Sequence, residues 1–340
     1  MALIWADGFE RYSNTAEMAK VWTGGANTFA AGRIQGSCAQ LTGYFLTFDE
    51  TDYPTISRIS PSGLGNATSG YIGFGVKVAN ASDTGVNFFQ LRDGYVSNGQ
   101  HLNLRTEGGF LKLYRNTTLI ATGAALAAGT WYYIEIYWNI HASTGTCTIK
   151  RDGATEINFT GNTYAGTGGT YVNTIVIQSG VVGSTTKSFD DMYISNSEFL
   201  GNFRAVRLTP SAAGSTTQWT PNAGLNYAAV DDAATDEDTT YVATSTDNNI
   251  DLYNLTSPTH GGTTILGVDV RYDYRREVSD TNFAPVFKTS GGTAQVGTTI
   301  PVTSGTYVAS NVLQTTNPET AVAWTQGDID DLEIGMKKLT

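Results

Sequence analysis

The alternation of apolar and polar residues is strongest between Gly129 and Asn158, where it predicts three consecutive antiparallel strands. In the first of these strands the even positions are all apolar: Tyr132, Ile134, Ile136, Trp138 and Ile140. Side chains alternate faces along a strand, so one face of this strand is expected in the core. A turn at 142–145 and a hairpin turn at Asp152-Gly153 lead into the second and third strands.

Similar patterns predict further strands before and after this meander. In the first part of the chain they are expected within 2–12 and at 71–78, 86–92, 101–106, 110–115, 119–123, 171–178 and 189–195. This number of strands suits a two-sheet sandwich, with one or two helical turns within 13–21. A change of pattern near 196–202 divides the chain into domains 1–198 and 199–340.

The second domain is predicted to be a smaller β-sandwich. Its strands are expected at 239–244, 250–255, 263–277, 284–288 and 307–314. A short helix over 326–336 should follow, capped by Thr325 together with Asp328. The prediction is therefore an all-β chain of two sandwiches with a short C-terminal helix.

Composition supports this fold class and excludes some functions. The chain has 38 glycines and only 15 % charged residues, which is typical of many turns and few long helices. A net charge of −11 without a basic cluster argues against nucleic acid as a partner. No apolar run approaches 18 residues and no basic-then-apolar leader is visible, so we expect synthesis in the cytoplasm and no membrane insertion. Cys38 and Cys147 do not suggest a disulfide framework, and Cys147 is expected to be buried.

Short motifs in the first domain resemble the laminin-G or concanavalin-A-like jelly roll. They are the opening Ala6-Asp7-Gly8-Phe9-Glu10, the Gly129-Thr130-Trp131 strand with its Asp-Gly hairpin, and the stretch 189–196, FDDMYISN. The second half resembles the tail half of bacteriophage structural proteins, through 200–204 (LGNFR), 218–221 (QWTP) and 323–325 (AWT). The resemblance implies a jelly roll in a virion protein of a tailed phage.

We predict no catalytic site. The carboxylate pattern of the endoglucanases in this fold class is absent, and Glu135 is the only acidic residue in the first strand of the meander. His101, His141 and His260 do not have the spacing of zinc ligands. Neither a nucleophile elbow nor a phosphate-binding loop is present.

Calcium is the one metal for which the sequence makes a case, because Asp carboxylates are hard oxygen ligands. The first and last strands of such jelly rolls lie side by side, which would bring Asp7 near Asp190 and Asp191. The alternative is that Asp7 belongs to an Asp-Gly turn and that one of the other two caps a neighbouring backbone. Otherwise no cofactor is expected.

Two surfaces are candidates for binding. The odd positions Trp131, Tyr133 and Tyr137, with Glu135, could form an aromatic platform for a glycan, or they could pack between sheets. In the second domain, one strand face carries alternating charges that could be solvated or could form a subunit contact: Asp269, Arg271, Asp273 and Arg275.

These observations favour a non-enzymatic structural protein of a tailed-phage virion, in the tail or neck or decorating the capsid, that contributes to host-surface attachment. Its partners would be other virion proteins, host glycans and its own copies in a trimer or ring. The alternative is a carbohydrate-binding lectin or adhesin module.

Overall fold

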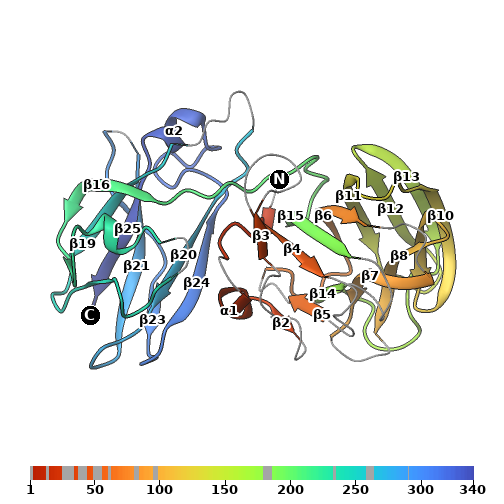
Figure 1. Cartoon of the computed structure of the whole chain (residues 1–340), viewed down its shortest axis with the longest axis horizontal. Helices are drawn as coiled ribbons and strands as arrows, with labels where there is room; N and C mark the ends of the chain where they lie inside the picture. The colour runs from red at the N-terminus through yellow and green to blue at the C-terminus, as the bar shows by residue number, and fades with distance from the viewer. Residues whose placement is uncertain are drawn as a thin grey trace. The chain divides into compact units, whose positions relative to one another are not determined.

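The computed structural model describes residues 3–12, 15–24, 34–36, 44–48, 56–59, 63–79, 84–94, 99–178, 186–232, 235–257, 264–289 and 291–340. Nearly all regular structure in these ranges is antiparallel β-sheet, which confirms the predicted fold class. The chain divides into two compact units, Met1–Ala205 and Val206–Thr340 (Figure 1). No helix of the described ranges has the length and apolar character needed to cross a membrane.

One sheet of the N-terminal unit has eight strands. Seven follow the order β13-β12-β11-β6-β15-β4-β3, and β1 also pairs with β15. Their bounds are β1 Leu3–Asp7, β3 Ile34–Gly36, β4 Tyr44–Phe48, β6 Ser69–Val78, β11 Trp131–Asn139, β12 Gly145–Arg151, β13 Ala154–Gly161 and β15 Lys187–Ser195. The antiparallel pairing of the first strand with the last, Asp7 opposite Met192, confirms that these strands lie side by side.

The second sheet of this unit has seven strands in the order β10-β9-β8-β7-β14-β5-β2. Their bounds are β2 Thr23–Gly24, β5 Ile56–Ile59, β7 Thr84–Arg92, β8 Gln100–Glu107, β9 Phe110–Arg115, β10 Thr118–Ala125 and β14 Thr174–Gln178. The short helix α1 (Thr15–Ala19) lies within the helical stretch expected at 13–21. Asn14, in the proposed helix cap, lies outside the described residues.

The two sheets enclose one apolar core. Ile134, Ile136 and Trp138 of β11 are buried in it together with Phe74, Phe89 and other strand residues, as the alternation predicts. The predicted meander is confirmed by the pairing of β11 with β12 and of β12 with β13. Asp152 and Gly153 both have positive φ, 51° and 83°, as a tight hairpin turn requires.

The segment 199–205 belongs to the N-terminal unit, beyond the boundary predicted after residue 198. Leu200 N–H donates to the Tyr193 hydroxyl at 3.0 Å, and Gly201 N–H donates to Glu135 at 2.8 Å. Phe203 packs on the ring of Tyr193, with 5.6 Å between the centroids. These contacts hold the segment against the outer face of the eight-stranded sheet.

The C-terminal unit contains a six-stranded sheet and two two-stranded sheets. In the larger sheet the order is β16-β19-β25-β21-β22, and β23 also pairs with β21. Its strands are β16 Pro210–Thr217, β19 Ile250–Leu255, β21 Thr281–Lys288, β22 Gln295–Val296, β23 Ile300–Val302 and β25 Glu333–Leu339. The small sheets pair β17 (Thr220–Pro221) with β18 (Val242–Ala243) and β20 (Val268–Tyr274) with β24 (Val308–Gln314). A 3-10 turn, η1, covers Tyr227–Ala229.

The core of this unit lies between the six-stranded sheet and the β20–β24 pair. Phe287, Ile334 and Trp324 form its centre, and Val270 and Val312 pack against it. The arrangement is sandwich-like, as predicted.

The end of the chain differs from the prediction of one helix over 326–336. Helix α2 (Gln326–Asp330) has the expected capping box between Thr325 and Asp328, but it ends after five residues. The next segment is strand β25, which pairs with β19 and β21. At Gly335 a Cβ atom would lie 1.7 Å from the Asp251 carbonyl oxygen, so the strands approach more closely there than a side chain allows.

Candidate functional site

Three carboxylates of the N-terminal unit form a candidate metal centre: Glu10, Asp190 and Asp191. One oxygen from each lies within 4.8 Å of the others, and among the described residues this is the one group of three or more potential metal ligands so close together. Two oxygens that are each about 2.4 Å from one calcium ion lie at most about 4.8 Å apart, so the spacing fits calcium. Backbone carbonyls or waters would complete the coordination of six to eight oxygens that calcium takes.

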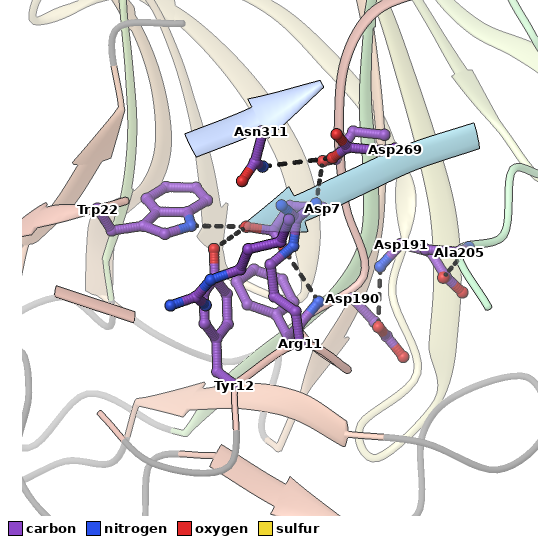
Figure 2. Close-up of polar contacts among 12 residues, drawn as sticks. Asp7, Arg11, Tyr12, Trp22, Asp190, Asp191, Ala205, Asp269 and Asn311 are labelled. Carbon is purple, nitrogen blue, oxygen red and sulfur yellow. Dashed lines mark hydrogen bonds and ion pairs between the residues drawn. The ribbon is translucent and has the colours of Figure 1, made fainter. Parts of the chain in front are cut away.

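A β-bulge explains how neighbouring residues contribute two ligands. The register of β15 against β6 shifts between Asp190 and Tyr193, and Asp191 has a φ of +49°. Regular alternation would send the two carboxylates to opposite faces, whereas the bulge allows both to approach Glu10. Asp191 N–H donates to Asp190 Oδ1 at 2.9 Å, and Ala205 N–H donates to Asp191 Oδ1 at 2.9 Å (Figure 2).

Burial and mutual repulsion make this cluster unfavourable when it is fully ionised. Burial, followed by the charges of Asp190 and Asp191, raises the pKa of Glu10 to about 10. Burial raises the pKa of Asp191 to about 6, against the lowering effects of the Ala205 hydrogen bond and of Arg204. Either a proton or a bound cation can relieve this repulsion, and a divalent cation does so with all three groups ionised.

Asp7 is not a member of the cluster, which corrects the ligand set expected from the sequence. Its Oδ2 accepts from the Tyr12 hydroxyl at 2.6 Å and from Trp22 Nε1 at 2.9 Å, and its Oδ1 accepts from Phe9 N–H at 3.0 Å. Arg11 Nε lies 3.5 Å from the same Oδ1. Figure 2 shows Trp22 and Tyr12 converging on Asp7. Asp7 therefore stabilises its own turn, as the alternative interpretation held, and Glu10 takes its place beside the two aspartates.

The proposed aromatic platform is wrong in its two central members. Tyr133 and Glu135 are only 3 % and 1 % exposed, because the segment 199–205 covers them. Glu135 also accepts from the Tyr193 hydroxyl at 2.6 Å, and Tyr133 donates to the Asp191 carbonyl at 3.0 Å. Neither side chain can stack on a sugar.

The other two platform residues are half-buried in pairs. The Trp131 ring lies 5.1 Å from Lys77 Nζ, and the Tyr137 ring lies 4.8 Å from that of Tyr71. The structure therefore leaves Trp131 and Tyr137 at separate contacts on either side of the covered residues.

A second candidate site is the outer face of the seven-stranded sheet, which we call the polar face. It consists of Asn87, Gln90, Asn103, Arg105, Glu107, Lys112 and Tyr114 on β7, β8 and β9. The strand register places Gln90 opposite Asn103, and Asn103 opposite Tyr114. Leucines at alternate positions point into the core, so polar side chains occupy the opposite face.

Two amide groups form the floor of the polar face. Gln90 is 3 % exposed and Asn103 is fully buried. Asn103 Nδ2 donates to the Asn116 carbonyl at 2.8 Å, but Asn103 Oδ1 and Gln90 Oε1 accept no hydrogen bond within the described part of the chain. A buried acceptor without a donor costs about 1–3 kcal/mol, so these two oxygens reduce the stability of the folded unit.

The remaining side chains of the polar face form a connected group. The Arg105 guanidinium carbon lies 3.9 Å from the centroid of the Tyr114 ring. The Tyr114 hydroxyl donates to Glu107, which also pairs with Lys112 at 3.4 Å. The hydrogen bond to Glu107, more than burial, raises the pKa of Tyr114.

The histidines and cysteines that the structure describes have structural roles. His101 is buried, which lowers its pKa, and its Nδ1 accepts from Ala165 N–H at 3.2 Å. His141 Nδ1 accepts from Thr144 N–H at 2.9 Å in the turn that precedes β12. Cys147 is buried, as expected. Cys38 and His260 lie outside the described residues.

The charged strand face of the C-terminal unit is paired internally. Arg271 contacts Asp273 through Nη2 at 2.8 Å and through Nε at 2.7 Å. Arg275 Nη2 lies 2.6 Å from Asp238 Oδ1, and Asp269 accepts from Asn311 at 3.3 Å. The subunit contact suggested for Asp269, Arg271, Asp273 and Arg275 remains a prediction.

Comparisons with known proteins assign no family to this chain. No protein-family model matches the chain, and no curated protein matches it. Among solved structures, a sialidase is similar at 12 % identity and a TM-score of 0.42, over 58 % of this chain and 19 % of the sialidase. A carbohydrate esterase of the Shiga toxin-encoding bacteriophage phi24B is similar at 14 % identity and a TM-score of 0.40, over 58 % and 99 % of the two chains.

A third similar structure is domain 4 of the arabinanase AbnA from Geobacillus stearothermophilus in complex with arabinotriose. It is 13 % identical with a TM-score of 0.38, over 57 % of this chain and 92 % of that domain. All three proteins are named for a carbohydrate that they act on or bind, and one comes from a phage. At these identities and TM-scores the similarities carry no argument about function, which must be argued from the residues.

Proposed function

We propose that the N-terminal unit is a non-catalytic carbohydrate-binding module whose binding surface is the polar face. The observation that carries the proposal is a group of half-buried polar side chains gathered on one sheet face: Asn87, Arg105, Glu107 and Lys112. Gln90 and Asn103 lie directly opposite each other on adjacent strands beside this group, but they are too buried to touch a ligand, so contacts with a sugar would come from the half-buried side chains.

The side chains around this pair suit a sugar. Saccharides present hydroxyls that donate and accept at close spacing, and amide, guanidinium and phenol groups are matched to them. Tyr114 is buried, and the Arg105 guanidinium lies over its ring, so Tyr114 supports the arginine and does not offer a stacking surface. The polar face thus presents several hydrogen-bonding groups close together.

The same face supports binding without catalysis. Glycoside hydrolysis uses two carboxylates, whereas the polar face as defined above carries one, Glu107. That carboxylate is held by Tyr114 and Lys112. A tyrosine that serves as a general base needs a lowered pKa, and the pKa of Tyr114 is raised.

A structural calcium at Glu10, Asp190 and Asp191 is part of this proposal. The support is the spacing and burial of the three carboxylates. The cation would join the turn after β1 to the bulge in β15 and so stabilise the N-terminal sandwich. It would take no part in contacts with the sugar.

We further propose that the module works in the virion of a tailed phage, where glycan binding would contribute to host attachment. The support is the resemblance of residues 200–204, 218–221 and 323–325 to phage structural proteins. A free lectin or adhesin is the alternative. Immunogold electron microscopy of source particles separates the two, because regular labelling supports the virion and unlabelled particles overturn it.

The binding proposal is tested on a glycan array and then by titration calorimetry of the full chain in calcium. Thr122 lies opposite Lys112 on the exposed edge strand β10, so Thr122→Trp places a bulky ring beside the polar face. Asn158 is an exposed residue on β13, the edge strand of the other sheet, and Asn158→Trp is the matched control. We expect Thr122→Trp to weaken binding and Asn158→Trp to preserve it. The reverse pattern, or an array without hits, contradicts the proposal.

A further inference from the structure

The guanidinium of Arg105 is held in one orientation on the polar face. Its Nε donates to Asn87 Oδ1 at 2.6 Å. One face of the group lies on the Tyr114 ring, with 3.9 Å from Cζ to the ring centroid. These two contacts fix the plane of the guanidinium. Arg105 also lies close enough to the Tyr114 hydroxyl to counteract part of the rise in the pKa of Tyr114.

Arg105 differs from the neighbouring Lys112 in its pairing with the acidic residue of this face. Lys112 forms an ion pair with Glu107 at 3.4 Å, and Glu107 also accepts from the Tyr114 hydroxyl. The ion pairs found among the described residues do not include Arg105, although Glu107 is near enough to interact with it electrostatically. The carboxylate of this face is therefore bound by Tyr114 and Lys112, and within the described residues Arg105 forms no ion pair of its own.

We propose that Arg105 selects a carboxylate-bearing sugar, such as a uronic or sialic acid, as the ligand of the polar face. The inference rests on the proposed carbohydrate-binding function and specifies its ligand class. The two NH2 groups would donate side by side to the sugar carboxylate, and the ring hydroxyls would reach the half-buried side chains of Asn87 and Lys112.

The physical basis is the fit between two planar groups. A guanidinium presents paired donors in the geometry of a carboxylate, and such pairs are stronger than neutral hydrogen bonds. Because the contacts to Asn87 and Tyr114 already order Arg105, little side-chain freedom would be lost on binding. The net charge of the chain is −11, so attraction of an anionic sugar must come from a local cation of this kind.

The test is calorimetric titration of the full chain, in calcium, with pairs of probes that differ in the carboxylate. The pairs are oligogalacturonate and its methyl ester, 3′-sialyllactose and lactose, and a hyaluronan oligosaccharide and its carboxyl-reduced form. We expect at least one acidic probe to bind about tenfold to a hundredfold more tightly than its neutral partner.

Three variants assign the selectivity to Arg105. Arg105→Gln should remove the preference for the acidic probe, and Arg105→Lys should restore only part of it because lysine lacks the paired donors. Lys150→Gln removes the same charge from the other sheet, where Lys150 lies over Phe199, and should leave the preference unchanged. Thermal melts of each variant establish that the fold is retained.

The outcomes separate this inference from the proposed function. Equal binding of acidic and neutral probes, or a preference that survives in folded Arg105→Gln, overturns the selectivity and leaves carbohydrate binding intact. Binding of none of the probes, with array hits confined to neutral glycans, likewise overturns the inference alone. An array without any hit overturns both.

Discussion

Replacing Glu10 should change how the stability of the N-terminal unit depends on pH and calcium. Glu10 has a pKa of about 10 in the folded chain, against 4.5 for an ordinary glutamate, because it is buried beside Asp190 and Asp191. Between these two values the folded state keeps a proton that the unfolded chain has released. Raising the pH therefore favours unfolding, and stability present below pH 4.5 is lost progressively toward pH 10.

The magnitude follows from the linkage between protons and folding. When the folded state retains one proton more than the unfolded state, the free energy of unfolding falls by about 1.4 kcal/mol per pH unit. The free energy of unfolding of the calcium-free chain should therefore fall by several kcal/mol between pH 5 and pH 9. Asp191, with a pKa of about 6, adds to the slope at the acidic end. Calcium replaces the proton and should flatten the curve. At a calcium concentration one hundred times its dissociation constant, binding adds about 2.7 kcal/mol to the free energy of unfolding.

The assay is urea unfolding in EDTA or calcium from pH 5 to pH 9, followed by tryptophan fluorescence. Trp22 is buried and donates to Asp7, so it reports on this region. Glu10→Gln cannot titrate and lacks the anionic ligand, so both the slope and the effect of calcium should shrink. Glu198→Gln, at an exposed position, is the matched control and should behave like the parent chain. Superimposed EDTA and calcium curves, or an unchanged slope in Glu10→Gln, would refute the reasoning.

Three other predictions follow from the same structure. Glu135→Ala removes the acceptor of the Tyr193 and Gly201 hydrogen bonds and should destabilise the N-terminal unit by about 2–4 kcal/mol in urea unfolding. A loss below about 0.5 kcal/mol would show that Glu135 does not hold segment 199–205 against the sheet. Burial raises the pKa of Cys147 to about 12, so this thiol should not react in the folded chain. In a Cys38→Ser variant a thiol reagent should therefore label the chain only after denaturation, and rapid labelling of the native chain would contradict this. If the charged face of β20 joins subunits, Arg271→Glu with Arg275→Glu should lower the mass of the oligomer in light scattering, and an unchanged mass in a folded variant sinks that contact.

The sequence predicts the sandwich well because its signals are local. Alternation along 131–140 and the Asp152-Gly153 turn specify strands and a hairpin without reference to the rest of the chain. The three candidate metal ligands depend on features that alternation does not encode. A positive φ at Phe9, 62°, and the bulge at Asp191 turn Glu10 and both aspartates toward one point, whereas simple strand adjacency selects Asp7.

The outer faces of the two sheets likewise depend on contacts that local alternation does not predict. Trp131 to Tyr137 have the alternation of an exposed face, but segment 199–205 returns from far along the chain and covers Tyr133 and Glu135. Polar residues alternate with Leu102 and Leu104 in the sequence, but only the pairing of neighbouring strands shows that they gather with polar residues of β7 and β9 on one face. At the C-terminus, good helix-forming residues become strand β25 because its pairing with β19 and β21 outweighs local preference.

The most direct test of carbohydrate binding at the polar face is a crystal structure of the full chain in calcium with a glycan identified on the array. The account predicts sugar density over β7, β8 and β9, with oxygens of the sugar within hydrogen-bond distance of Asn87, Arg105 or Lys112. Density over Tyr71 and Tyr137 on the other sheet, or on the C-terminal unit, would contradict it.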